Sequence, residues 1–172
     1  MSRPRNALRL NVGFLVNQSI GYSREFPFEF PALRIEPDLD LTDLFGSARV
    51  TRTPQGLFVQ MKMSASLVAE CARCLTDLEQ HLEVDFAELY AFSARTASES
   101  GLILPEDGHI DLTPLLREYM LLEIPISPIC SPECKGLCSF CGEPINDNPH
   151  QHGKDEIDPR LAILNQLLDD LE

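Results

Sequence analysis

The longest regular pattern of apolar and polar side chains in this sequence lies between residues 57 and 92. Apolar residues occupy the odd positions from Leu57 to Cys71, and polar residues occupy most of the even positions. A period of two is typical of a strand with one buried and one solvent-facing side. Because a strand over 57–71 is long, the pattern also predicts a bend or bulge within it.

A second alternation, from Leu78 to Phe92, begins after a short link at 72–76. Two alternating stretches joined by so short a link predict an antiparallel hairpin over 57–92. Ahead of this hairpin, Pro54-Gln55-Gly56 is a turn signal, and it predicts a further strand over 47–53.

The beginning of the chain has weaker patterns. Leu8, Leu10 and Val12 alternate, and so do Phe26, Phe28 and Phe30, where neighbouring prolines restrict the chain to an edge strand or a bulge. Residues 40–45 are predicted to form a short helical turn. We therefore expect residues 1–92 to form an antiparallel β domain.

The rest of the chain predicts helices. Residues 93–108 are rich in Ser, Ala, Glu and Gly and predict a flexible loop. Asp111-Leu112-Thr113-Pro114 predicts a helix start, and Pro125 ends that helix. Asp158-Pro159 opens a terminal amphipathic helix, whose leucine stripe is expected to dock on the body of the protein. The expected fold class is α+β, with residues 109–172 holding a helix, a Cys-rich segment at 130–152 and the terminal helix.

Length, hydropathy and charge narrow the class of protein. A chain of 172 residues can bury one core, or one core and a small satellite. The sequence has neither a membrane-spanning apolar run nor a signal-peptide core, so we expect a cytoplasmic, reducing environment.

The net charge is −13. Residues 53–172 carry seven Lys/Arg and twenty-one Asp/Glu, which disfavours broad contact with nucleic acid. This acidity either maintains solubility or suits a basic protein partner.

The segment 130–152 holds four thiols and two imidazoles. In a reducing compartment such a cluster indicates a metal site more than disulfides. Four cysteines around one zinc would make a closed, structural site, and these are the predicted ligands: Cys130, Cys134, Cys138 and Cys141. An alternative set leaves the first two cysteines as spares and consists of Cys138, Cys141, His150 and His152. The cysteine spacing differs from that of ferredoxin iron–sulfur sites.

A separate pair, Cys71 and Cys74, lies at the link of the predicted hairpin. It has three readings: a metal knuckle, a redox pair, or a compact turn with small buried residues. Cys71 continues the apolar side of its strand, which favours burial. A redox role is disfavoured, because redox cysteines usually begin a helix.

Together these motifs resemble the YceD family. The resemblance rests on Cys71-Ala72-Arg73-Cys74-Leu75, on the run from Cys134 to Gly142, and on Asp158-Pro159-Arg160-Leu161, and it covers about 45–172. It implies a role in the accumulation of large-subunit ribosomal RNA, in bacteria and chloroplasts, without enzymatic activity. It also implies a link to a small basic ribosomal protein of the large subunit. His150 and His152 stand where many relatives carry a further cysteine pair.

Three functions follow from these observations. The favoured one is a non-enzymatic ribosome-biogenesis factor that binds a basic large-subunit ribosomal protein or a pre-ribosomal particle. The alternative is direct binding of ribosomal RNA through arginines and aromatic residues near the N-terminus: Arg3, Arg5, Arg9, Arg24, Arg34, Tyr22, Phe26 and Phe28. An enzyme built on Asp107, His109 and Asp111 is disfavoured, since no nucleophile or phosphate-binding motif accompanies them.

Overall fold

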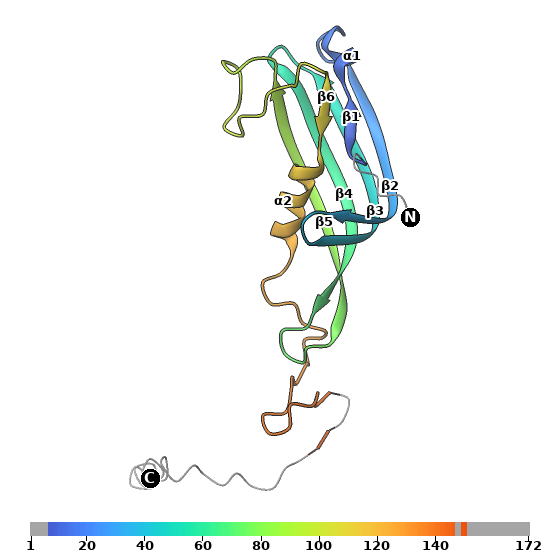
Figure 1. The fold of residues 1–172 in the computed structure, drawn as a ribbon, viewed down its shortest axis with the longest axis vertical. Helices are drawn as coiled ribbons and strands as arrows, with labels where there is room; N and C mark the ends of the chain where they lie inside the picture. The colour runs from blue at the N-terminus through green and yellow to red at the C-terminus, as the bar shows by residue number, and fades with distance from the viewer. Residues whose placement is uncertain (1–6, 147–148, 151–172) are drawn as a thin grey trace, which may run out of the picture.

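A computed structural model of the chain describes residues 7–146 and 149–150, and its main feature is a four-stranded antiparallel sheet (Figure 1). The strands lie in the order β2-β3-β4-β5, so each strand pairs with its neighbour in the sequence. Their bounds are Ser23–Ile35 for β2, Leu39–Arg52 for β3, Gly56–Glu70 for β4 and Asp77–Ala91 for β5. The predicted antiparallel sheet is confirmed.

The predicted long hairpin consists of β4 and β5. Their register runs without a break from Gly56 opposite Ala91 to Glu70 opposite Asp77. The odd-numbered apolar residues of β4, from Leu57 to Leu67, are buried, as the alternation predicts.

The irregularity expected in the 57–71 strand lies instead in its partner β3. Between Thr42 and Phe45 the chain of β3 advances by one residue more than β4 does between Ser66 and Ser64. Asp43, within this bulge, has a positive φ of 48°. The predicted helical turn over 40–45 is therefore wrong, because these residues belong to β3. The bulge shifts the buried positions from odd to even numbers and so hides the strand pattern.

A second layer covers one side of the sheet (Figure 1). It contains the short pair β1 (Arg9–Asn11) and β6 (His109–Asp111), the single turn α1 (Gly13–Val16), and α2 (Thr113–Glu123), which packs on β5. Helix α2 begins where predicted. The Asp111 carboxylate accepts a hydrogen bond of 2.9 Å from the Thr113 N–H, and Pro114 suits the first turn.

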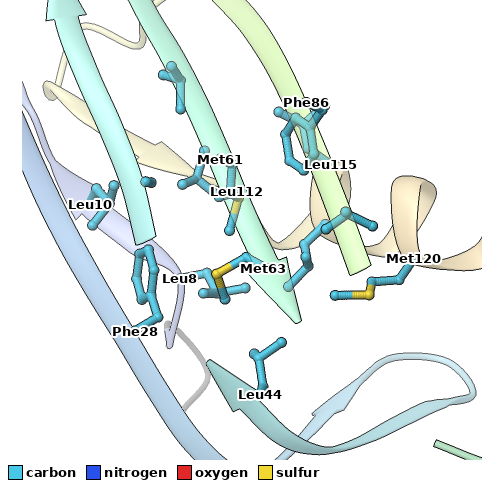
Figure 2. Packing of buried hydrophobic residues seen from close by; sticks show 14 of the residues in the cluster. Leu8, Leu10, Phe28, Leu44, Met61, Met63, Phe86, Leu112, Leu115 and Met120 are labelled. Atoms are coloured by element: carbon cyan, nitrogen blue, oxygen red, sulfur yellow. The ribbon is translucent and has the colours of Figure 1, made fainter. Parts of the chain in front are cut away.

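One hydrophobic core joins the two layers, as Figure 2 shows for residues from both. Met61 and Phe86 of the sheet lie there with Leu8, Leu112 and Met120 of the covering layer. Met120 is fully buried and anchors α2. Apolar side chains from before residue 92 and after residue 108 thus share one interior.

The segment 93–108 contains no helix or strand. Leu102 and Leu104 nevertheless pack against the core, so part of the segment is attached to the body. The division into parts at 1–92, 93–108 and 109–172 stays a prediction. The predicted terminal helix lies outside the described residues. Among those residues, no helix has the length and apolar character needed to cross a membrane.

Candidate metal centres and the acidic sheet face

Four thiols meet at the tip of the β4–β5 hairpin. Cys71 and Cys74 come from the hairpin link, and Cys130 and Cys134 come from the segment that follows α2; their sulfur atoms all lie within 4.8 Å of one another. The Sγ–Sγ distance is 3.9 Å between Cys71 and Cys134 and 3.6 Å between Cys74 and Cys130. A tetrahedral zinc with Zn–S bonds of about 2.3 Å requires sulfur–sulfur distances of about 3.8 Å. The four sulfurs therefore fit a tetrahedral zinc centre, and all four thiols are free.

Backbone contacts bring the two parts of this cluster together. The Ala72 N–H donates to the Pro128 carbonyl over 2.8 Å, and the Leu137 N–H donates to the Arg73 carbonyl over 3.2 Å. The Arg73 guanidinium donates to the Cys134 carbonyl over 3.0 Å. These hydrogen bonds hold the segment after α2 against the hairpin link, and Figure 1 shows the two backbones side by side.

Hydrogen bonds to sulfur shift the acidity of these thiols. The Cys74 N–H is the main cause that lowers the pKa of Cys71 to about 6. The Asn146 side-chain amide, 3.1 Å from the sulfur, lowers the pKa of Cys134. The pKa of Cys130 is raised to about 12, chiefly by its hydrogen bond with Cys134. The surroundings thus favour the thiolate of Cys71 and of Cys134 and the protonated thiol of Cys130, whereas a bound divalent cation would stabilise all of them as thiolates.

A second group contains Cys138, Cys141 and His150, whose donor atoms also lie within 4.8 Å of one another. Cys141 Sγ is 3.1 Å from His150 Nε2. The Cys141 N–H is the main cause that lowers the pKa of Cys138 to about 6. Cys138 is buried and Cys141 is exposed, so this group lies nearer the surface than the first.

The four cysteines predicted as one ligand set fall into these two groups. Cys130 and Cys134 join the hairpin cysteines, whereas Cys138 and Cys141 join His150. Of the alternative set, three members come together, and His152 lies outside the described residues. Sequence reasoning missed the combination across the hairpin, because the two cysteine pairs are separated by more than fifty residues. The available signal was that each of the two pairs, Cys71/Cys74 and Cys130/Cys134, consists of closely spaced cysteines, as pairs of metal ligands often do.

Asp107, His109 and Asp111, the residues considered for an enzyme site, have structural roles. The Asp107 carboxylate accepts hydrogen bonds from the His109 N–H at 3.0 Å and from the Arg9 guanidinium at 2.7 Å. The first of these is the main cause that holds the pKa of Asp107 below its usual value. Asp111 binds the first turn of α2. All three residues therefore support the β1–β6 pair and the helix that follows it.

The arginine and aromatic residues near the N-terminus are mostly engaged within the protein. Phe28 is buried in the core, and Arg34 forms an ion pair with Asp40 at 3.0 Å. Arg24 stacks on the rings of Phe14 and Phe26. The two remaining arginines lie outside the described residues: Arg3 and Arg5.

The side of the sheet that faces away from α2 is strongly acidic. Strand register and alternation with the buried residues place three cations there: Arg49, Lys62, and Arg34, which is paired with Asp40. The exposed carboxylates on this outer face are Glu25, Glu29, Asp40, Glu70, Asp77, Glu79, Glu83 and Asp85. Arg49 lies 3.8 Å from a Glu25 oxygen and Lys62 lies 2.7 Å from an Asp85 oxygen. Five carboxylates thus have no Lys or Arg partner among the described residues.

A hollow of about 600 Å³ opens on this outer face. It is lined by Phe45 and Gly46 at the β3 bulge, by Lys62, and by the carboxylates of Glu83 and Asp85. The hollow therefore combines an aromatic wall with negative charge.

Comparison with known proteins gives the context for these features. The family described as "Large ribosomal RNA subunit accumulation protein YceD" matches residues 59–168, which include both ends of the four-thiol cluster. The chain belongs to the YceD family. This confirms the resemblance that its cysteine motifs indicate.

Several YceD-like relatives are similar to this chain over much of its length. An uncharacterized protein of Mycobacterium tuberculosis is 37% identical over 76% of this chain, which spans 61% of that protein's length. The uncharacterized protein YlbN of Bacillus subtilis is 33% identical over 62% of this chain and 63% of its own length. The Arabidopsis thaliana protein named "Large ribosomal RNA subunit accumulation protein YCED homolog 1, chloroplastic" is 34% identical over 40% of this chain and 21% of its own. No solved structure matches the chain.

Proposed function

We propose that this protein is a non-enzymatic ribosome-biogenesis factor that acts in the cytoplasm. It supports accumulation of large-subunit ribosomal RNA by binding a basic ribosomal protein or an assembling large subunit. Membership in a family named for that accumulation supports the biological context. The acidic outer face of the sheet is the observation that carries the proposed mode of binding.

The balance of charge on this face favours a basic protein over naked RNA. Eight carboxylates and three cations make a surface that repels phosphate groups and attracts Lys and Arg side chains. Complementary charge of this kind accelerates association and weakens as salt rises. We therefore expect contact with ribosomal RNA to be indirect or weak.

The hollow on the outer face is suited to one basic side chain of the partner. Glu83 supplies a carboxylate with no Lys or Arg partner among the described residues, which can pair with a guanidinium or ammonium group; Asp85 already lies 2.7 Å from Lys62, and Phe45 supplies an aromatic wall. Arg fits this combination better than Lys, because its planar group can both stack and form paired hydrogen bonds.

The four-thiol cluster is proposed to hold a structural zinc. Cys71, Cys74, Cys130 and Cys134 would supply all four ligands, which leaves no open position for substrate or water. Three of these residues are almost fully buried, as is usual for a site that supports folding. Zinc here would fix the segment 128–146 against the hairpin and so set the shape of this end of the molecule.

Charge reversal on the outer face tests the proposed binding. The variant Glu79→Lys/Glu83→Lys should lose affinity for a basic large-subunit ribosomal protein or for precursor particles in a sedimentation assay at low salt. The matched control Glu99→Lys/Glu106→Lys makes the same change of net charge in the 93–108 segment and should retain affinity. Binding of neither target by the unaltered protein, or equal loss in both variants, would overturn the proposal. Tight binding of naked ribosomal RNA would favour the alternative of direct RNA contact.

A further inference from the structure

The hairpin link forms a distinctive cysteine turn around the first metal centre. The Cys71 N–H donates to the Thr76 carbonyl over 2.9 Å, and the Leu75 N–H donates back to the Cys71 carbonyl over 3.0 Å. Leu75, the residue after the second cysteine, has a positive φ of 58°. This backbone directs the sulfurs of Cys71 and Cys74 to one point.

The chain forms the same turn a second time at Cys138. The Cys138 N–H donates to the Glu143 carbonyl over 2.8 Å, and the Gly142 N–H donates to the Cys138 carbonyl over 2.9 Å. Gly142, again the residue after the second cysteine, has a positive φ of 73°. Each hydrogen bond of the first turn thus has its counterpart at the same spacing, with Cys138 and Cys141 in the places of the two hairpin cysteines.

A third donor lies beside the second turn. His150 Nε2 is 3.1 Å from the Cys141 sulfur, and all three donor atoms lie within 4.8 Å of one another. A tetrahedral zinc places sulfur and nitrogen ligands about 3.5 Å apart, so the two donors need separate by only a few tenths of an ångström. We propose that Cys138, Cys141 and His150 bind a second zinc ion, independent of the first.

The chemistry of the three donors indicates both the metal and its behaviour. Two thiolates and one imidazole favour zinc over calcium or magnesium, which prefer oxygen ligands. The described residues provide three ligands, so one position remains for His152 or for an exchangeable donor such as water. Because Cys141 is exposed and the ligand set is smaller, this zinc should exchange faster than the zinc of the four-thiol cluster.

Native mass spectrometry of the full chain, loaded with zinc alone, tests this proposal. The unaltered protein should carry two zinc ions, and Cys141→Ser and His150→Ala should each carry one. Ser139→Ala changes an exposed residue inside the same turn without removing a ligand, so it should keep two. Titration with a metal-binding dye should release one zinc early and one late, and only the early step should disappear in Cys141→Ser.

The readouts also separate the two centres. Cys74→Ser should remove the late step and leave the early one. Cadmium substituted for zinc should give two NMR resonances, one typical of four sulfur ligands and one typical of mixed sulfur and nitrogen ligands. A single zinc in the unaltered protein, or two zinc ions retained in Cys141→Ser and His150→Ala, would overturn the proposal.

Discussion

Removal of the proposed zinc from the four-thiol cluster should release one end of the molecule and leave the sheet intact. The perturbation is Cys134→Ser, which keeps the ligands of the second proposed centre; a chelator acting on the unaltered protein would empty both centres. Cys134 is nearly fully buried, and none of the four ligands belongs to the main hydrophobic core. Three of them, Cys71, Cys74 and Cys134, instead form a separate small cluster with Leu78 and Leu137. The two parts should therefore respond independently.

The magnitude follows from the contacts of residues 128–146. Ordering roughly 19 residues costs at least about 1 kcal/mol each in backbone entropy, or about 19 kcal/mol. Hydrogen bonds within the segment and to the hairpin, about ten among the described residues, contribute about 1 kcal/mol each. A structural zinc contributes about 10–16 kcal/mol in small zinc-binding peptides. The proposed zinc would therefore supply the stabilising free energy that the hydrogen bonds do not, and without it the segment should detach.

Hydrogen exchange measured by mass spectrometry gives the assay. After chelation, amides in 72–76 and 128–146 should exchange at nearly unprotected rates, while amides of β3 and β4 keep their protection. Ser131→Ala, which alters an exposed side chain between two of the ligands, is the control and should behave as the unaltered protein.

Two results would refute this reasoning. Protection that persists in 128–146 after complete metal removal would mean that packing, and not metal, holds the segment. Protection that is lost throughout β3 and β4 would mean that the cluster supports the core as well.

Three further predictions concern stability and metal affinity. Met120→Ala removes the fully buried anchor of α2 and should lower the free energy of unfolding, measured by urea denaturation, by about 2–5 kcal/mol. The control Leu122→Ala changes a side chain that is 79% exposed and should alter this free energy by less than about 0.5 kcal/mol. Gly136→Ala places a Cβ 3.1 Å from the Arg73 carbonyl oxygen at a φ of +79°, while Gly142→Ala at +73° meets nothing within 4 Å. Both variants should be destabilised by roughly 1 kcal/mol of backbone strain. A zinc competition titration should show a larger loss of zinc affinity at the four-thiol cluster for Gly136→Ala, because only this variant also meets the Arg73 carbonyl. Equal losses of affinity in the two variants would contradict this argument. Acidification should release zinc, because protons compete for the thiolates and the affinity for zinc falls as pH falls. Zinc release detected with a dye, together with an unchanged circular dichroism signal of the sheet, checks this.

The sequence was most informative where one side of a strand is buried without interruption. The alternation from Leu57 to Cys71 and from Leu78 onward predicted β4, β5 and their pairing, because each buried position repeats every two residues. In β3 the same physics operates, but the bulge at Asp43 changes the spacing of the buried leucines from two to three. A spacing of three imitates a helical turn, and the prediction failed there for that reason.

The candidate metal ligands show a different limit of sequence reasoning. Spacing singled out Cys130, Cys134, Cys138 and Cys141 as candidate ligands, and their proximity in the chain suggested one shared set, whereas the structure divides them between two groups. The pairing of Cys130 and Cys134 with the hairpin cysteines depends on where α2, packed on β5, ends and so delivers the segment that follows it. That position is set by tertiary packing of the helix, which no local pattern encodes.

The regularity of β5 has a consequence for what the acidic face can discriminate. Its outward carboxylates at Asp77, Glu79, Glu83 and Asp85 recur at every second residue, with His81 taking the place between. Alternate residues of a strand are about 6.6–6.8 Å apart, and any extended polypeptide has nearly the same repeat. A flexible tail with Lys or Arg at alternate positions would meet these carboxylates in step, whereas a helix or a compact basic patch of equal charge would not. The face should therefore distinguish partners by the spacing of their charges as well as by their number.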